Sequence, residues 1–256
     1  MKILKFNYLF FLFSFLVTLS CSSDDDSTEE IDDSKTENLK ALGLSASDLL
    51  SDNTYKSLTV ELSYSSGYRP TQQTIDDFKT FLEERINKPG GITFIETQIE
   101  RPEEGTVTIE QIKEIEAEKR TIYTFEDDIA VYIYFTHAKA STDTESTVTL
   151  GTAYLNTSIV LYEQTLVDVT SSQNSSLYVL EETTLQHEFG HLFGLVNIQG
   201  DDIHSEHEDL AHRKHCFVED CLMYFKSNTR QFYRNRVSVP ILDPLCIEDL
   251  QAKGGK

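Results

Sequence analysis

Apolar and polar residues along this chain follow the spacings of strands and helices from residue 57 onward. Residues 57–64 alternate between apolar and polar side chains, which predicts a half-buried strand. Residues 92–99 predict a second strand. Residues 129–135 are apolar without alternation, as expected of a central strand that is covered on both faces. Two shorter strands are predicted at residues 149–154 and 158–162.

Helical spacing separates these strands. Apolar residues recur at helical intervals over residues 75–86, and Pro89 ends the pattern. Thr108 and Gln111 form a capping-box pair, which predicts a helix that reaches about residue 120. Short helices are also expected at residues 39–50 and 245–252, and polar loops at residues 138–147 and 170–176. The order of elements predicts one α/β domain over residues 39–256, built on a mixed, twisted sheet.

The N-terminus has the pattern of a secretory signal. Lys2 and Lys5 precede an apolar run over residues 8–19, and this run is too short to be retained as a membrane-spanning helix. Cys21 follows directly and, with the three residues before it, resembles a lipobox, in which the cysteine is lipidated. We therefore expect a lipoprotein signal peptide over residues 1–20. Secretion without a lipid anchor is the alternative.

Residues 21–38 are expected to form an acidic tether. Residues 24–37 contain eight acidic residues and one lysine, and they contribute −7 of the formal net charge of −21. Such a segment cannot bury apolar surface. The Ser-Asp-Asp-Asp run near Cys21 resembles the signal that exports lipoproteins of Bacteroidetes to the cell surface. We therefore expect an outer-membrane lipoprotein exposed at the surface.

The overall acidity limits the partners. It disfavours nucleic acid and anionic membrane surfaces, and it is compatible with basic or neutral peptides. Contact with the membrane is expected through the lipid anchor only, and the chain is expected to be a monomer.

The candidate chemistry is concentrated in one helix. His187, Glu188 and His191 form the pattern HExxH, and two histidines four residues apart can bind one metal ion from one face of a helix. The apolar residues around them fall on roughly the opposite side, so the histidines are expected to point away from the core. Glu188 lies between the two faces, where a carboxylate can act as a general base. This helix is expected to begin near Val179.

A glycine and a second motif extend this pattern. Gly194 is placed to end the helix in the left-handed region of backbone conformation. The third histidine of the usual HExxHxxGxxH pattern would fall on Asn197, so the sequence departs from it there. Farther on, His215, Cys216, Cys221 and Met223 resemble the His-Cys-x4-Cys-x-Met run of archaemetzincins, which belong to the metzincin class of zinc peptidases.

The resemblance implies a metal site of three histidines. His215 is its third ligand, with His212 and His207 as alternatives from the same histidine-rich loop. Met223 corresponds to the methionine of the Met-turn, beneath the metal, in a smaller and irregular C-terminal part.

The cysteines leave two interpretations. Archaemetzincins use cysteines in this region for a second, structural zinc, but this chain lacks their downstream Cys-x2-Cys. In an oxidising compartment we favour a disulfide between Cys216 and Cys221, with Cys246 free.

The resemblance further implies a zincin-like α+β fold with one antiparallel edge strand, placed on residues 150–154. Gly151 and Ala153 there would leave room for a substrate backbone, although an ordinary edge strand would read the same way.

The expected function is that of an envelope-anchored zinc endopeptidase, a peptide hydrolase similar to lipoprotein metallopeptidases of Bacteroidetes. One catalytic Zn²⁺ activates water, with Glu188 as general base, and the substrate is a peptide or protein. The alternative is a non-catalytic, zinc-binding surface lipoprotein that scavenges metal or docks a partner.

Overall fold

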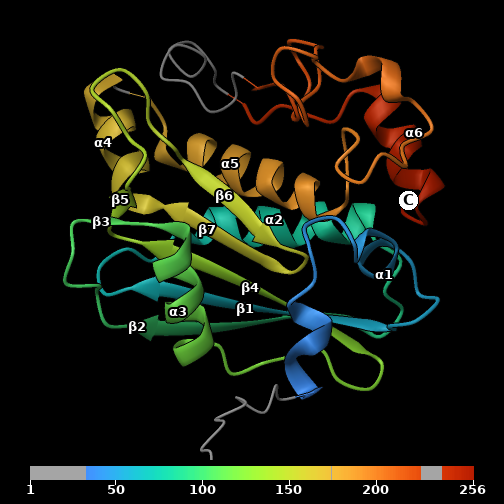
Figure 1. Cartoon of the computed structure of the whole chain (residues 1–256), viewed down its shortest axis with the longest axis horizontal. Helices are drawn as coiled ribbons and strands as arrows, with labels where there is room; N and C mark the ends of the chain where they lie inside the picture. Colours follow the sequence, from blue (N-terminus) through green and yellow to red (C-terminus); the bar gives the residue numbers. More distant parts are fainter. Residues whose placement is uncertain (1–32, 174, 226–237) are drawn as a thin grey trace, which may run out of the picture. The chain divides into compact units, whose positions relative to one another are not determined.

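A five-stranded mixed sheet forms the centre of the fold. The computed structural model describes residues 33–173, 175–225 and 238–256. The strand order is β2-β1-β4-β7-β6 (Figure 1). The strands are β1 (Ser57–Ser65), β2 (Gly91–Ile99), β4 (Asp128–Thr136), β6 (Gly151–Leu155) and β7 (Ser158–Tyr162). All neighbours are parallel except β6, which pairs antiparallel with β7. The expected mixed sheet with one antiparallel edge strand is confirmed.

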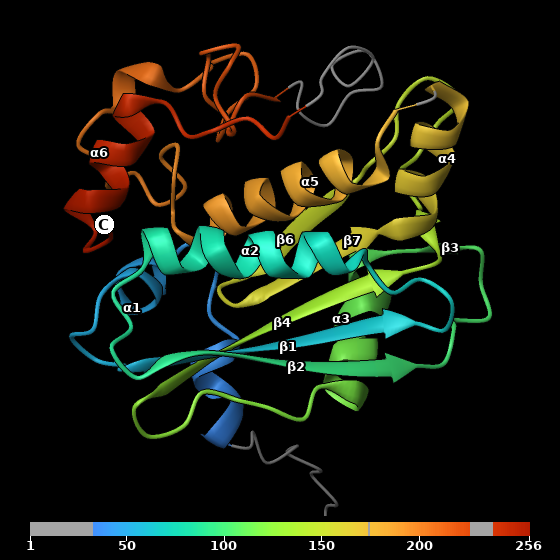
Figure 2. The ribbon, with the colours of Figure 1, turned by 180° about the vertical axis from the view of Figure 1, so that it is seen from behind.

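Helices cover both faces of this sheet (Figures 1 and 2). The α-helices are α1 (Ala46–Leu50), α2 (Gln72–Arg85), α3 (Ile109–Lys119), α4 (Glu163–Gln173), α5 (Leu177–Leu192) and α6 (Pro244–Ala252). Two 3-10 helices, η1 (Asp33–Asn38) and η2 (Ser205–His207), and the short strand pair β3 (Thr106–Val107) and β5 (Lys139–Ala140) complete the described elements. Helices α2 and α5 lie side by side on one face, where the Phe78 and Phe189 rings pack 5.3 Å apart. Helix α3 covers the opposite face (Figure 1).

Strand β1 is buried on both faces, so the prediction of a half-buried strand was wrong. Glu61 and Ser63, on the face expected to meet solvent, are fully buried. The loop after α3 makes this burial tolerable, because the Glu61 carboxylate accepts hydrogen bonds from the backbone N–H groups of Thr121 and Ile122. A buried carboxylate that accepts such bonds avoids most of the cost of losing water.

The polar loop predicted for residues 170–176 also differs, because residues up to Gln173 continue α4. Thr170 shows how a polar sequence remains helical here. Its hydroxyl donates to the carbonyl of Leu166 at 2.9 Å, one turn earlier, so the side chain is satisfied inside the helix.

The folded part begins earlier than the predicted boundary at residue 39. Residues 33–38, expected to belong to the tether, form η1, and Asn38 is fully buried. The Asn38 side-chain nitrogen lies within hydrogen-bond distance, 2.9–3.0 Å, of Thr124 Oγ1, Ala130 O and Thr157 Oγ1. These bonds fix the start of the domain to strand β4 and to the turn before β7. The predicted signal peptide, Cys21 and residues 21–32 lie outside the described residues.

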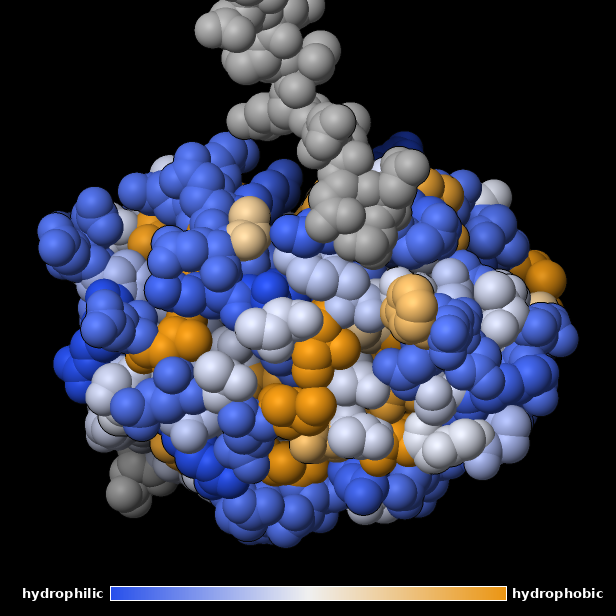
Figure 3. Space-filling view, turned by 90° about the horizontal axis from the view of Figure 1, so that it is seen from below, coloured by the Kyte–Doolittle hydropathy of each residue, from blue (hydrophilic) through white to orange (hydrophobic). Residues whose placement is uncertain are grey.

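Strand β2 forms the edge of the sheet opposite to β6. Figure 3 shows the side of the molecule on which β2 lies, where apolar side chains form small areas between hydrophilic ones. Ile95 on β2 is 40% exposed. Among the described helices, none has both the length and the apolar content needed to cross a membrane.

Candidate metal centre

Helix α5 carries the HExxH residues. Ser176 caps its N-terminus by accepting a hydrogen bond from the Val179 N–H, so the helix begins two residues before the expected start. It ends at Leu192, and Gly194 adopts a φ of 69°. The left-handed glycine turn predicted from the sequence is therefore present, and it directs the chain back across the helix.

Helix α5 is buried on all sides. His187 is 0% exposed and His191 is 7% exposed, and Glu188 is buried between them. The expectation that the histidines face away from the core does not hold, because the chain after Gly194 lies over that side of α5 (Figure 1). The two histidines of α5 therefore lie buried between the helix and the C-terminal segment.

Three histidines meet beneath this segment. One ring nitrogen from each of His187, His191 and His215 lies within 4.8 Å of the others. The ring centroids of His187 and His191 are 4.8 Å apart, and that of His215 is 5.3 Å from both. The structure thus brings together the three residues that the sequence motifs selected.

The state of these rings fits a divalent metal. His187 Nδ1 pairs with the Leu222 carbonyl at 2.8 Å, so its proton resides on Nδ1 and its lone pair on Nε2. Burial, followed by the charge of His215, lowers the pKa of His187 to about 3. Burial lowers the pKa of His191 well below its usual value, and its buried Nδ1 has no hydrogen-bond partner among the described residues. Neutral, closely spaced imidazoles are the form that binds zinc.

The two alternative third ligands lie elsewhere. His207 is buried, and its Nε2 is 2.9 Å from a carboxylate oxygen of Asp249. His212 is exposed, and its Nδ1 pairs with Asp209 at 2.8 Å. Neither belongs to the cluster of three histidines.

Glu188 faces the edge strand β6. One of its carboxylate oxygens accepts a hydrogen bond from the Ala153 N–H at 2.9 Å. Burial is the main cause that raises the pKa of Glu188 to about 7. A Cβ atom at position 151 would lie 2.8 Å from Glu188 Cγ and 2.8 Å from a Thr184 methyl. The space at Gly151 is therefore used by α5, rather than by a substrate backbone as we expected.

Met223 packs directly against α5. It is fully buried, and a Cβ atom at Gly190 would overlap its sulfur. Glycine at position 190 therefore permits the close approach of the Met223 segment. The same segment supplies the Leu222 carbonyl that orients His187, so the predicted Met-turn residue lies where it supports the histidines.

The predicted Cys216–Cys221 disulfide is absent, and Cys216, Cys221 and Cys246 are buried free thiols. Cys216 Sγ instead approaches His207 Nδ1 at 3.4 Å and Asp243 Oδ2 at 3.2 Å. Cys221 Sγ lies 3.7 Å from Cys246 Sγ. Hydrogen bonds from the neighbouring thiols are the largest cause that lowers the pKa of Cys216 and favours its thiolate.

This second cluster could hold a metal of its own. Ligand atoms of four residues lie within 4.8 Å of one another: His207, Cys216, Asp243 and Cys246. The sequence did not predict this cluster, because the expected signature of a second zinc site was a downstream Cys-x2-Cys pair, which this chain lacks. The available signal was Cys246 followed three residues later by Asp249, which holds His207 in the cluster.

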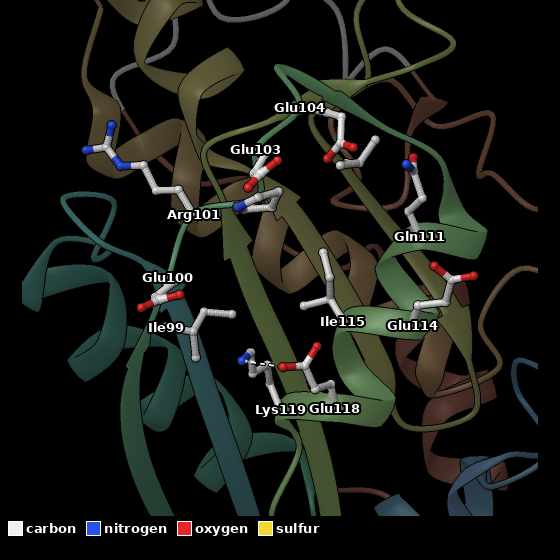
Figure 4. A pocket seen from close by; sticks show the side chains of 12 residues that line it. Ile99, Glu100, Arg101, Glu103, Glu104, Gln111, Glu114, Ile115, Glu118 and Lys119 are labelled. Atoms are coloured by element: carbon white, nitrogen blue, oxygen red, sulfur yellow. Dashed lines mark hydrogen bonds and ion pairs between the residues drawn. The ribbon is translucent and has the colours of Figure 1, made fainter.

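Two cavities of the described part differ sharply in charge. One of about 300 Å³ adjoins the histidines and is lined by Leu42, Gly151, Thr152, Ala153, Glu188, His191, Ile198, Arg213, Lys214 and His215. The other, of about 400 Å³, lies between the end of β2 and α3 (Figure 4). Five glutamates line it, Glu100, Glu103, Glu104, Glu114 and Glu118, against Arg101 and Lys119. Figure 4 shows Lys119 paired with Glu118, at 2.6 Å.

Comparisons with known proteins identify the fold. No family model matches this sequence, and no curated protein matches it. The crystal structure of archaemetzincin from Methanopyrus kandleri superposes with a TM-score of 0.50 at 19% identity, covering 77% of this chain and 96% of that one. A zinc-dependent peptidase from Methanocorpusculum labreanum superposes with a TM-score of 0.48 at 16% identity, covering 75% and 99%. The chain has an archaemetzincin-like fold.

The contact between Gly190 and Met223 can be tested by stability. We expect Gly190→Ala to lower the free energy of unfolding, because overpacking a core costs about 1–3 kcal/mol and alanine recovers only about 1 kcal/mol in a helix. The control is Gly105→Ala, since a Cβ there would meet nothing within 4 Å. Urea denaturation of both variants measures the difference. A Gly190→Ala protein at least as stable as wild type would contradict the close packing.

Proposed function

We propose that this chain is a zinc-dependent endopeptidase held at the cell envelope by a lipid anchor. The observation that carries the catalytic part is the cluster of His187, His191 and His215, with Glu188 beside it at the wall of an open cavity. Metal binding alone does not require a buried carboxylate next to the ligands. The archaemetzincin-like fold supports the proposal at the level of the fold, and the residues of the site carry the catalytic part.

The three histidines would hold the ion, and Glu188 would move the proton. When bound, zinc supplies a Lewis acid that polarises the scissile carbonyl and makes water a nucleophile at neutral pH. Glu188 takes a proton from the attacking water and delivers it to the leaving amine. Its pKa of about 7 suits both steps, because a group that titrates near the working pH exchanges protons most effectively.

Strand β6 would position the substrate. It is the last strand of the sheet, and its outer edge pairs with no other strand of the described part. Gly151, Thr152 and Ala153 of β6 line the cavity that contains Glu188 and His191. An extended peptide that adds to this edge would therefore run past the catalytic residues.

The lipid anchor rests on residues outside the described part. Cys21 follows an apolar segment of signal-peptide length, and an acidic run separates it from η1. We propose that Cys21 is lipidated and that the folded domain stands at the outer face of the outer membrane.

Replacement of Glu188 separates catalysis from metal binding. We expect Glu188→Gln to retain zinc and to lower kcat for peptide hydrolysis by about 10²–10⁴-fold, because the proton acceptor is lost. Zinc content by mass spectrometry and cleavage of a broad peptide library measure both properties in the full chain. Unchanged cleavage by Glu188→Gln would refute the role of Glu188. Zinc without cleavage by wild type would favour the non-catalytic zinc-binding protein.

The third ligand can be identified by metal content. We expect His215→Ala to lose one equivalent of zinc relative to wild type, since one of three ligands is removed. His212→Ala is the matched control, because His212 is exposed and lies outside the cluster. Loss of zinc in His212→Ala with retention in His215→Ala would reverse the assignment.

The anchor can be tested by fractionation of cells that produce the full chain. We expect wild type in the membrane fraction and Cys21→Ser in the soluble fraction, because the acylated thiol is removed. Equal membrane association of both proteins would refute lipidation of Cys21.

A further inference from the structure

Two cations stand at the mouth of the candidate site. Arg213 and Lys214 directly precede His215, and both line the cavity beside the metal-ligating cluster. Among the described residues that line this cavity, Glu188 is the one acidic side chain. The cavity is therefore cationic at its rim in a chain whose formal net charge is −21.

This charge is not a general feature of the surface. The other cavity, between β2 and α3, is lined by five glutamates and two cations. Some other cations of the described part pair with carboxylates, for example Arg69 with Glu96 and Lys139 with Asp168. Arg213 and Lys214 have no ion-pair partner within residues 33–173, 175–225 and 238–256.

The nearest acidic residues of the same loop are engaged elsewhere. Glu208 accepts a hydrogen bond from the backbone N–H of Lys214 at 3.0 Å, and Asp209 pairs with the His212 ring. These carboxylates fix the backbone of the loop rather than neutralise the two side chains. Arg213 and Lys214 are exposed and remain available to an anion that enters the cavity.

The backbone that presents these cations is held in an unusual conformation. Lys214 has a φ of 69°, in the left-handed region that costs a non-glycine residue about 1–3 kcal/mol. The turn is closed by His215 Nδ1, which lies 3.1 Å from the Arg213 carbonyl, and by the Asp209 N–H, which donates to the His215 carbonyl at 2.7 Å. The loop that positions His215 therefore also fixes the backbone from which the Arg213 and Lys214 side chains extend.

Lys214 lies close to the histidines. It directly precedes His215 and lines the same cavity as His191 and Glu188. An anionic group bound to Lys214 would therefore lie close to the reacting bond of a peptide on β6. Arginine binds carboxylates through two parallel hydrogen bonds and lysine acts as a compact charge, so the pair is suited to one carboxylate.

We propose that Arg213 and Lys214 bind a carboxylate of the substrate, so that this site selects peptides with a negative charge near the scissile bond. The inference rests on the proposed peptidase function. The carboxylate can come from an aspartate or glutamate side chain or from the C-terminus of the peptide. This preference is opposite to the one that the net charge of the whole chain suggested.

The test compares matched peptides and matched variants of the full, zinc-loaded chain. Each peptide cleaved by wild type is made with Glu or Gln at the residues flanking the cut, and with a free or an amidated C-terminus. The variants are R213Q/K214Q, which removes two positive charges from the cavity, and, as a control that removes one positive charge from another surface, Lys79→Gln. Lys79 is an exposed residue of α2 outside the cavity. Zinc content and melting temperature show whether each variant is folded.

We expect wild type to prefer the carboxylate-bearing peptide by about tenfold in kcat/KM, the size of one charge-assisted hydrogen bond. R213Q/K214Q should lose this preference mainly through KM, and Lys79→Gln should keep it. A preference within the Glu and Gln pair identifies a side chain, and one within the acid and amide pair identifies the C-terminus. Equal cleavage of all pairs by wild type, or an equal loss on all peptides in R213Q/K214Q, would overturn the proposal.

A binding measurement separates this proposal from the peptidase function. Fluorescence anisotropy of labelled Glu and Gln peptides with Glu188→Gln reports recognition without turnover. Tighter binding of the Glu peptide or of the free acid, lost in a triple variant that adds R213Q/K214Q, would support carboxylate recognition even if wild type cleaves nothing. Equal binding of charged and neutral peptides would refute it, whatever the outcome for catalysis.

Discussion

The close packing of the C-terminal segment on α5 is the constraint on which the site depends. An HExxH helix alone supplies two histidines and leaves one side uncovered. Here the Leu222 carbonyl meets His187 Nδ1 at 2.8 Å, and the Met223 carbonyl accepts a hydrogen bond from the Cys216 N–H at 2.8 Å. The second bond fixes the residue that follows His215. One short stretch of backbone thus orients one ligand and positions another.

Local signals predicted the parts of the fold that depend on neighbouring residues in the sequence. The capping box of Thr108 and Gln111 is formed, and Gly194 is left-handed, because both follow from the chemistry of a few adjacent residues. The error at β1 came from a residue whose state depends on a distant partner, because the loop after α3 supplies the donors that allow Glu61 to be buried. The error at α4 was local, because the Thr170 hydroxyl is satisfied by the Leu166 carbonyl of its own helix.

The candidate site shows the same division. Spacing within a helix was enough to select His187 and His191. The third ligand had alternatives, because the sequence of a long loop does not determine where its residues lie. Of the three candidates, His215 is the one that lies beside His187 and His191 in the structure. The cluster around Cys216 joins residues from three separate segments, and no spacing rule relates Asp243 to it. The same holds for charge, because the net charge of the chain did not predict the two cations that line the cavity beside the histidines.

Asn38 fixes η1 to the domain, and this limits how far from the membrane the candidate site can lie. In Figures 1 and 2, η1 lies at the opposite end of the domain from the segment that covers α5. Under the proposed lipidation of Cys21, residues 22–32 are the only spacer, and they span roughly 40 Å at full extension. The length of this spacer would then limit the distance from the membrane at which the protein can cut a peptide bond. That limit is the extended length of the spacer plus the height of the domain.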